Sequence, residues 1–163
     1  MMEEMMLDEQ NLREEILVRC LQSSDLESMV LVDQKSIGRR REEYLKLKLE
    51  SGLTETGIAV SLAAELENRF AGFLIARVFY GEFGMPEQVA VLDTIGVHPD
   101  FRHKGVAKAL LGQLKKNLLC LGITQVQTEV SWEAQSLLSF FQHEGFKPAA
   151  RFCLDLNLDS SSI

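Results

Sequence analysis

A short basic loop, RHKGVA at residues 102–107, has the residues of an anion site. The apolar residues that follow it recur at a spacing of three, four and seven, which predicts a helix that starts at the end of the loop. Free backbone N–H groups and the positive end of the helix dipole meet there, and a phosphate is the usual ligand of such a place. Gly105 allows the ligand to approach the backbone closely. Arg102, Lys104 and, when protonated, His103 add positive charge.

A single carboxylate, Asp93, interrupts an otherwise apolar stretch before the loop. The stretch, residues 89–98, predicts a strand buried on both faces, and Pro99 ends it. Strand parity places the Asp93 side chain on the same face as Ile95 and Val97, and burial would raise its pKa toward the range in which a general base works. The alternative interpretations of Asp93 are a structural acid with hydrogen-bond partners and an acid at the solvent-exposed end of the strand. The alternative for the basic loop is a set of solvated charges before a core helix.

Length and composition limit the class of protein. The chain has 163 residues, of which 46% are hydrophobic and 25% charged, and this fits one globular domain, expected at residues 15–158 between tails at 1–14 and 159–163. The net charge of −7 argues against nucleic acid as a partner and favours a cationic acceptor such as an amine. No apolar run approaches the roughly 20 residues of a membrane helix, and the acidic start does not look like a secretory signal.

The three cysteines predict neither disulfides nor a metal site. Cys20, Cys120 and Cys153 are far apart, each in apolar surroundings. We interpret them as buried thiols in a reducing compartment, which predicts a cytoplasmic protein. The three histidines are scattered and do not form a metal-binding constellation.

Strands and helices alternate in a way that would position the loop and the carboxylate. Hydrophobic periodicity predicts strands at residues 15–21, 58–66, 70–80, 89–98, 123–130 and 152–158, a short extended piece at 146–149, and helices at 26–36, 107–121 and 132–144. The region 39–50 is ambiguous. Leu45, Leu47 and Leu49 alternate as in a strand, whereas the density of charged residues favours a helix.

Arg-x-x-Gly-x-Ala at residues 102–107, one short loop after a strand that ends in Val-His-Pro, resembles the pyrophosphate-binding motif of the GNAT acetyltransferases. The order of elements is similar to that family over most of the chain, and Gly145-Phe146 after an amphipathic helix looks like its C-terminal signature. The resemblance implies an α/β (α+β) GNAT fold, with a mixed central sheet of about seven strands flanked by helices. In that fold the fourth and fifth strands run parallel but splay apart, and the splay holds the cofactor.

The resemblance also implies acetyl-CoA as cosubstrate, and no metal. The loop would hold the pyrophosphate through backbone N–H groups and the helix dipole. The pantetheine arm would pair with the backbone of the fourth strand as a peptide does. The implied cofactor-binding residues are Ile95, Gly96, Val97, Arg102, His103, Lys104, Gly105, Val106, Ala107 and Lys108.

Acyl transfer to an amine needs a base, and Asp93 is the first candidate because several GNAT members carry an acid or a His on this strand. Glu129 on the neighbouring strand and Glu82 in the preceding loop are alternatives, acting directly or through a water, although a solvated charge is the simpler interpretation of both. Phe141 stands where many members have a catalytic Tyr, so no acid can be assigned. A thiol with a pKa of about 8.5 can leave as thiolate without one.

The sequence therefore predicts an acetyl-CoA-dependent N-acetyltransferase, in which a deprotonated amine attacks the thioester directly within a ternary complex. The acceptor is left open between a small-molecule amine and a protein amine, with no nucleic acid and no membrane as partner. The alternative is a non-catalytic module of GNAT fold that binds acyl-CoA or a partner protein; Phe141 favours it and Asp93 argues against it. The last strands also offer a surface for a homodimer.

Overall fold

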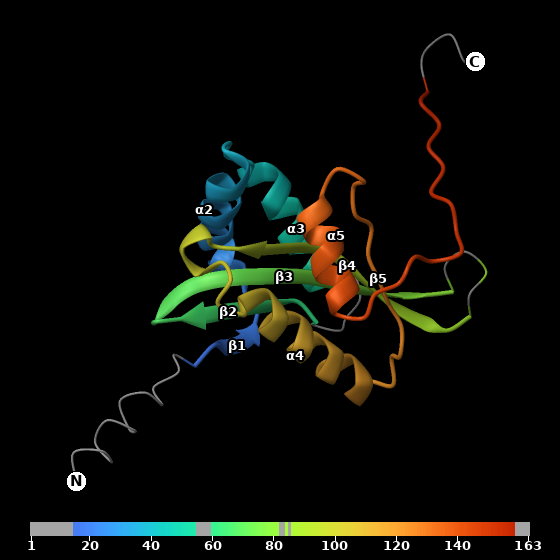
Figure 1. The fold of residues 1–163 in the computed structure, drawn as a ribbon, viewed down its shortest axis with the longest axis horizontal. Coiled ribbons are helices and arrows are strands. Elements are labelled where there is room, and N and C mark those ends of the chain that lie inside the picture. Colours follow the sequence, from blue (N-terminus) through green and yellow to red (C-terminus); the bar gives the residue numbers. More distant parts are fainter. Residues whose placement is uncertain (1–14, 55–59, 82–83, 85, 159–163) are drawn as a thin grey trace. The chain divides into compact units, whose positions relative to one another are not determined.

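The computed structural model of the protein describes residues 15–54, 60–81, 84 and 86–158 (Figure 1). These residues form two compact units, one within residues 1–129 and one within residues 130–163. The first unit contains an open sheet with helices packed against it. The second contains one short helix and a C-terminal stretch without regular secondary structure.

The described part of the sheet has five strands in the order β1-β2-β3-β4-β5. The strands are β1 (Leu17–Cys20), β2 (Leu62–Leu66), β3 (Arg69–Tyr80), β4 (Gln88–Val97) and β5 (Val126–Gln127), and the helices are α2 (Leu26–Ile37), α3 (Glu42–Thr54), α4 (Val106–Cys120) and α5 (Gln135–His143). The first four strands are antiparallel to their neighbours, whereas β5 runs parallel to β4. The expected mixed α/β architecture is confirmed, with five strands among these residues instead of about seven.

A two-residue turn joins β2 to β3. Leu66 and Arg69 are paired across the hairpin, and Glu67 and Asn68 between them both have left-handed backbones, with φ of 55° and 57°. Two such residues in a row give a turn whose twist matches that of the flanking strands, and Asn tolerates this conformation well. The turn lies between the two strands that the sequence predicts at residues 58–66 and 70–80.

The ambiguous region 39–50 contains most of α3. Leu45 and Leu49, four residues apart, are buried, while Leu47 between them is 65% exposed. A strand would have placed all three side chains on one face, so only a helix fits this burial. With α2 and with Phe73 of β3, the two leucines form a core cluster that covers one face of the sheet.

The helix α4 covers the opposite face. A Cβ built on Gly72 of β3 would lie 3.0 Å from Cγ1 of Val106 in α4, and Gly72 is next to Phe73 in the strand, so the two point to opposite faces. Gly122, with φ of 75°, follows the last turn and ends α4, in agreement with the helix predicted at residues 107–121. No helix in the described ranges is both long and apolar enough to span a bilayer.

In the second unit, α5 is shorter than the predicted helix at residues 132–144. Phe141 is buried, and its ring centroid lies 4.9 Å from that of Phe146 and 5.3 Å from that of Phe140. Gly145, with φ of 94°, follows the helix and ends it.

The predicted strand at residues 152–158 is wrong. These residues have no regular secondary structure, and Phe152 and Leu154 are 95% and 88% exposed. Alternation shows which side chains would share a face, but a strand also needs a neighbour to bond its backbone. Within the described sheet no strand pairs with this segment.

The cysteines are likewise not buried. Cys20, Cys120 and Cys153 are all exposed, so the prediction of buried thiols is wrong. Cys20 is the last residue of an edge strand and Cys120 the last residue of α4, where neighbouring apolar residues in the sequence do not imply a position in the core.

Candidate cofactor and acyl-transfer site

Gly105 is the residue from which α4 starts. Its φ of 88° is left-handed, a conformation that glycine adopts without strain, and a Cβ there would lie 3.9 Å from Cδ1 of Ile16, its nearest neighbour. The first helical hydrogen bond runs from the N–H of Ala109 to the carbonyl of Gly105 at 2.9 Å, so the N–H groups of residues 106–108 have no acceptor inside the helix. In the part of the chain that is described, no side chain caps this end. These N–H groups can therefore bind a ligand.

The side chains around this helix end are basic. The exposed residues Arg102, His103, Lys104 and Lys108 all belong to the predicted cofactor set. Arg102 Nη2 donates to the hydroxyl of Ser36 at 3.3 Å, and Lys104 Nζ pairs with Glu67 at 3.0 Å. Exposed ion pairs contribute about 0–1 kcal/mol, so an anionic ligand can replace such a contact at little cost.

The strands β4 and β5 part soon after they meet. The last paired position joins Val91 to Gln127, yet β4 continues to Val97. In the described part of the sheet, no strand lies beside β4 on this side beyond that point. On this edge the rest of β4, which includes Ile95 and Gly96, has no partner strand among the described residues, and an extended ligand with amide groups could pair with its backbone.

At Asp93, β4 contains a β-bulge. Ile75 of β3 is paired with Thr94 and Ala76 with Leu92, so Asp93 has no partner residue in β3. One extra residue in a strand interrupts the alternation of its side chains between the two faces.

The bulge makes one prediction wrong, because Asp93 does not share a face with Ile95 and Val97. Asp93 points to α3, where its Oδ2 meets Nζ of Lys48 at 2.9 Å. Val97 is paired with Gly72, which faces α4, and Ile95 has the same parity as Val97. Parity assigns faces only within an uninterrupted strand, and nothing in the local sequence reveals the interruption.

Among the described residues, three polar side chains contact the carboxylate of Asp93. Besides Lys48, Arg77 Nη2 donates to Oδ2 at 3.2 Å and the hydroxyl of Thr94 donates to Oδ1 at 3.2 Å. Arg77 is itself held by Ser51, whose Oγ accepts from Nη1 at 3.0 Å. The Asp93 side chain is 12% exposed, so it is nearly buried, but among charged groups instead of apolar ones.

Two other acids, Glu129 and Glu82, are predicted as alternatives to Asp93. Glu129 is exposed and follows β5 by two residues, and Glu82 lies outside the described residues. Phe141, at the position of the family's Tyr, is buried within the second unit.

Sequence analysis did not identify Lys48 and Arg77. Their pairing with Asp93 joins residues that are 45 and 16 positions apart. The spacing of Tyr44 and Lys48, four residues apart, could have indicated that the two side chains share a face of α3. In the structure the Lys48 Nζ lies 5.7 Å from the centre of the Tyr44 ring.

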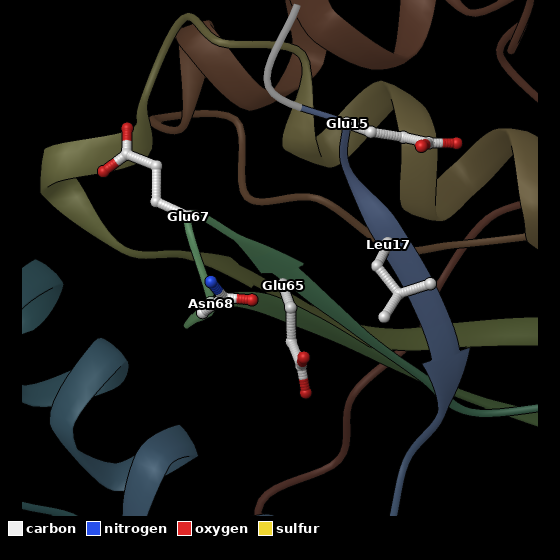
Figure 2. A pocket seen from close by; sticks show the side chains of 5 residues that line it. All are labelled: Glu15, Leu17, Glu65, Glu67 and Asn68. Carbon is white, nitrogen blue, oxygen red and sulfur yellow. The ribbon is translucent and has the colours of Figure 1, made fainter. Parts of the chain in front are cut away.

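A small cavity of about 200 Å³ lies at the edge of the sheet, beside β1 and the β2–β3 turn (Figure 2). Its lining consists of Glu15, Leu17, Glu65, Glu67 and Asn68. Glu65 pairs with Arg19 at 2.7 Å, and Glu67 pairs with Lys104 of the basic loop. Within the described ranges no cluster of three or more metal-ligating side chains occurs, here or elsewhere.

His98 connects β4 to the turn that precedes the loop. It is 8% exposed, and its Nδ1 accepts the N–H of Asp100 at 3.1 Å, so the neutral ring has its proton on Nε2. Burial, followed by the positive charge of Lys35, holds the pKa of His98 below its ordinary value of 6.5.

A model described as the acetyltransferase (GNAT) family matches residues 22–146 of the chain, which is most of its length. The match includes α2 to α5 and the whole described sheet except β1.

Solved proteins of similar fold include several acetyltransferases. The aminoglycoside N-acetyltransferase AAC(6')-Iy, solved with CoA, has a TM-score of 0.72 and 21% identity, over 88% of this chain and 95% of that chain. A ribosomal-protein-alanine N-acetyltransferase from Brucella melitensis biovar Abortus 2308 has a TM-score of 0.70 and 17% identity, over 89% and 100% of the two chains. A transcriptional regulator from Bacillus halodurans C-125 has a TM-score of 0.69 and 18% identity, over 88% and 100%. At these identities the likeness concerns the fold.

Proposed function

This chain belongs to the acetyltransferase (GNAT) family, and from that premise we propose that it is an N-acetyltransferase that transfers the acetyl group of acetyl-CoA to a primary amine. The observation that carries the proposal is the uncapped N-terminus of α4 at Gly105, beside the open edge of β4. The helix N-terminus suits a pyrophosphate, and the strand edge suits the pantetheine arm with its two amides. Only residues 98–104 separate the end of β4 from Gly105.

The residues present fit acetyl-CoA. The N–H groups of residues 106–108 would bind the pyrophosphate, with Arg102, His103, Lys104 and Lys108 as basic neighbours. The backbone of Ile95, Gly96 and Val97 would pair with the pantetheine arm. Acetyl-CoA would supply the acetyl group as a reactive thioester.

For proton removal from the acceptor, Asp93 remains our candidate base, and Glu129 and Glu82 remain the alternatives. Asp93 is supported by its position at the point where β4 leaves β5, on the face that α3 covers. An acceptor amine that approached from this face would meet its carboxylate. A backbone N–H of the unpaired part of β4 could donate to the oxyanion that forms during transfer.

We propose direct attack by the amine within a ternary complex. Phe141 has no proton to donate, and the leaving thiol, with a pKa of about 8.5, can depart as thiolate. We assign no cysteine as a nucleophile, because Cys120 is the last residue of α4, at the opposite end of the helix from Gly105. Initial-rate lines that intersect are expected, and parallel lines would indicate an acyl-enzyme instead.

The acceptor is either a small-molecule amine or an amine of a protein. Both kinds are named among the proteins of similar fold, one an aminoglycoside acetyltransferase and one a ribosomal-protein-alanine acetyltransferase. We further propose a cytoplasmic protein with one GNAT domain at residues 15–158 that forms a homodimer through its C-terminal segment.

A second function, a non-catalytic module that binds acyl-CoA or a partner protein, is favoured by one observation. Phe141 replaces the family's Tyr and is buried among aromatic rings. Acetyl-CoA binding without turnover of any amine would support this second function.

Substitution of Gly105 tests the cofactor site. We expect the unmodified protein to bind acetyl-CoA with micromolar affinity, about −8 kcal/mol, and Gly105→Glu to abolish binding because it places an anion where the pyrophosphate should lie. The matched control is Gly105→Ala, which has the same backbone strain at φ of 88° but no charge and has room for its Cβ. Isothermal titration calorimetry measures both, with circular dichroism to check folding. If the folded unmodified protein does not bind, the proposed function is wrong.

A further inference from the structure

Lys48 presents a primary amine beside the candidate base. Its Nζ lies 2.9 Å from Oδ2 of Asp93, and its side chain is 30% exposed. The helix that carries it is fixed to the core by Leu45 and Leu49, and the Tyr44 ring lies one turn away. The amine is therefore held in one place and is still accessible to solvent.

The place at which the Lys48 amine meets β4 decides whether it can reach a bound thioester. Asp93 comes two residues after Val91, the last β4 residue that is paired with β5, and four residues before Val97. Four residues of strand span about 13 Å. If the pyrophosphate lies on the loop that follows Val97, an arm along this edge runs back toward Asp93, and its thioester end reaches the carboxylate that Lys48 contacts. This step depends on the proposed function.

We propose that Lys48 is itself an acetyl acceptor, so that the protein acetylates its own α3 helix at this residue. The Lys48 ammonium occupies the place beside Asp93 in which the ammonium of an external acceptor would be bound. A base that can deprotonate an external amine there can also deprotonate Lys48.

The step balances without a further reactant. The Lys48 ammonium gives one proton to Asp93, and the nitrogen lone pair attacks the carbonyl carbon of the thioester. The C–N bond forms, the C–S bond breaks, and the sulfur leaves with the bonding pair as thiolate. The second nitrogen proton is lost to solvent or to the thiolate, and the products are an amide on Lys48, free CoA and one proton.

Acetylation would change the site. The amide nitrogen carries no charge, so the ion pair with Asp93 is lost, while Arg77 and Thr94 keep their hydrogen bonds to it. We expect the modified protein to have an altered KM for its amine acceptor.

Peptide mass spectrometry of the full chain, incubated with acetyl-CoA and no added acceptor, tests the proposal. Lys46 is the internal reference, since it lies on the same helix and is exposed to chemical acetylation but, two residues from Lys48, does not share its face. General-base assistance contributes about 100-fold or more, so Lys48 should be acetylated about 100-fold faster than Lys46. The rate should be first order and independent of protein concentration, because the acceptor lies in the same chain.

Two variants complete the test. Asp93→Asn should reduce the Lys48 rate to that of Lys46, and Lys48→Arg should give no acetylation at this position while keeping the charge and the fold. If Asp93→Asn does not fold, the comparison of the unmodified chain with Gly105→Glu tests the proposal instead. Loss of cofactor binding in Gly105→Glu should remove the difference in acetylation rate between Lys48 and Lys46.

The outcomes separate this proposal from the function on which it rests. If calorimetry shows binding of acetyl-CoA but Lys48 reacts no faster than Lys46, self-acetylation is wrong and the proposed function stands. A rate that rises with protein concentration also overturns it. If acetyl-CoA does not bind at all, both proposals fail together.

Discussion

Asp93 shows how much the meaning of one carboxylate depends on its neighbours. In the sequence it is a single acid in an apolar strand. In the folded chain it receives hydrogen bonds from Lys48, Arg77 and Thr94 and faces α3. A base in this position has to exchange a cationic partner for the acceptor amine, and this requires Lys48 to be displaced when the acceptor binds.

Substitution of Asp93 separates a base from a structural acid. If it removes the amine proton, Asp93→Asn should lower kcat by about 100-fold or more and leave the KM for acetyl-CoA unchanged. Thr94→Val is the matched control, since it removes a hydrogen bond to the same carboxylate but keeps the acid. Steady-state kinetics on the first amine found to be a substrate measures both. Equal effects of the two variants would contradict the role of base.

His98 predicts a pH dependence of stability. Its folded-state pKa lies below the ordinary 6.5, mainly because it is buried, so the unfolded chain binds a proton more readily than the folded one. The contribution of neutral His98 to the free energy of unfolding is therefore fully present above pH 6.5. It is lost as the pH falls through the lower folded-state pKa. Urea unfolding at pH 7.5 and 5.5 should show a loss of stability that His98→Gln reduces and that the control His143→Gln does not. An unchanged loss in His98→Gln would contradict the prediction.

At the scale of elements, the site depends on the approach of α2 and β3 to β4. Gly96 of β4 makes this approach possible: a Cβ there would lie 2.8 Å from Cε1 of Phe73 and 3.4 Å from Cγ1 of Val32. The aromatic ring of one strand lies directly on the backbone of the next. The same residue belongs to the edge that is proposed to bind the cofactor arm.

Two glycine substitutions test this packing. Gly96→Ala should lower the free energy of unfolding by about 1–3 kcal/mol, because the core must move to admit the methyl group. Gly112→Ala, in the middle of α4 with no atom within 4 Å of its Cβ, should instead raise it by about 0.5–1 kcal/mol. Chemical denaturation measures both, and a similar effect at the two positions would contradict the packing argument.

At the scale of the whole molecule, the exposed apolar side chains of the C-terminal segment, residues 152–158, favour binding to a second chain. The side chains of Phe152, Leu154, Leu156 and Leu158 are between 80% and 95% exposed. Apolar surface in water costs about 25 cal/mol per Å², and an alternating segment of this kind can add to the edge of a sheet. This is the basis for the proposed homodimer.

Light scattering tests the homodimer. The unmodified chain should have the mass of two chains, and the double variant Leu154→Asp, Leu156→Asp should have the mass of one. Asn157→Asp in the same segment is the control, since it adds a charge without removing apolar surface. A monomer in all three cases would overturn the proposal.

The sequence by itself determined the family, the basic loop and most of the local structure. The helix stops at Gly122 and Gly145, the turn at Glu67 and Asn68, and the start of α4 beside Gly105 all depend on the conformation of a few adjacent residues. Helical periodicity identified α4 because its buried residues are near one another in the chain. Such features need no knowledge of distant partners.

Only the tertiary structure decided which face Asp93 occupies, which cations it meets and how far β5 extends. The bulge in β4 is defined by its register with β3, and Lys48 reaches Asp93 from 45 residues away. Strand 152–158 was predicted from side-chain alternation, yet a strand exists only where a neighbour pairs with its backbone. Register, ion pairing and strand pairing are relations between distant segments, and for that reason a local pattern could not determine them.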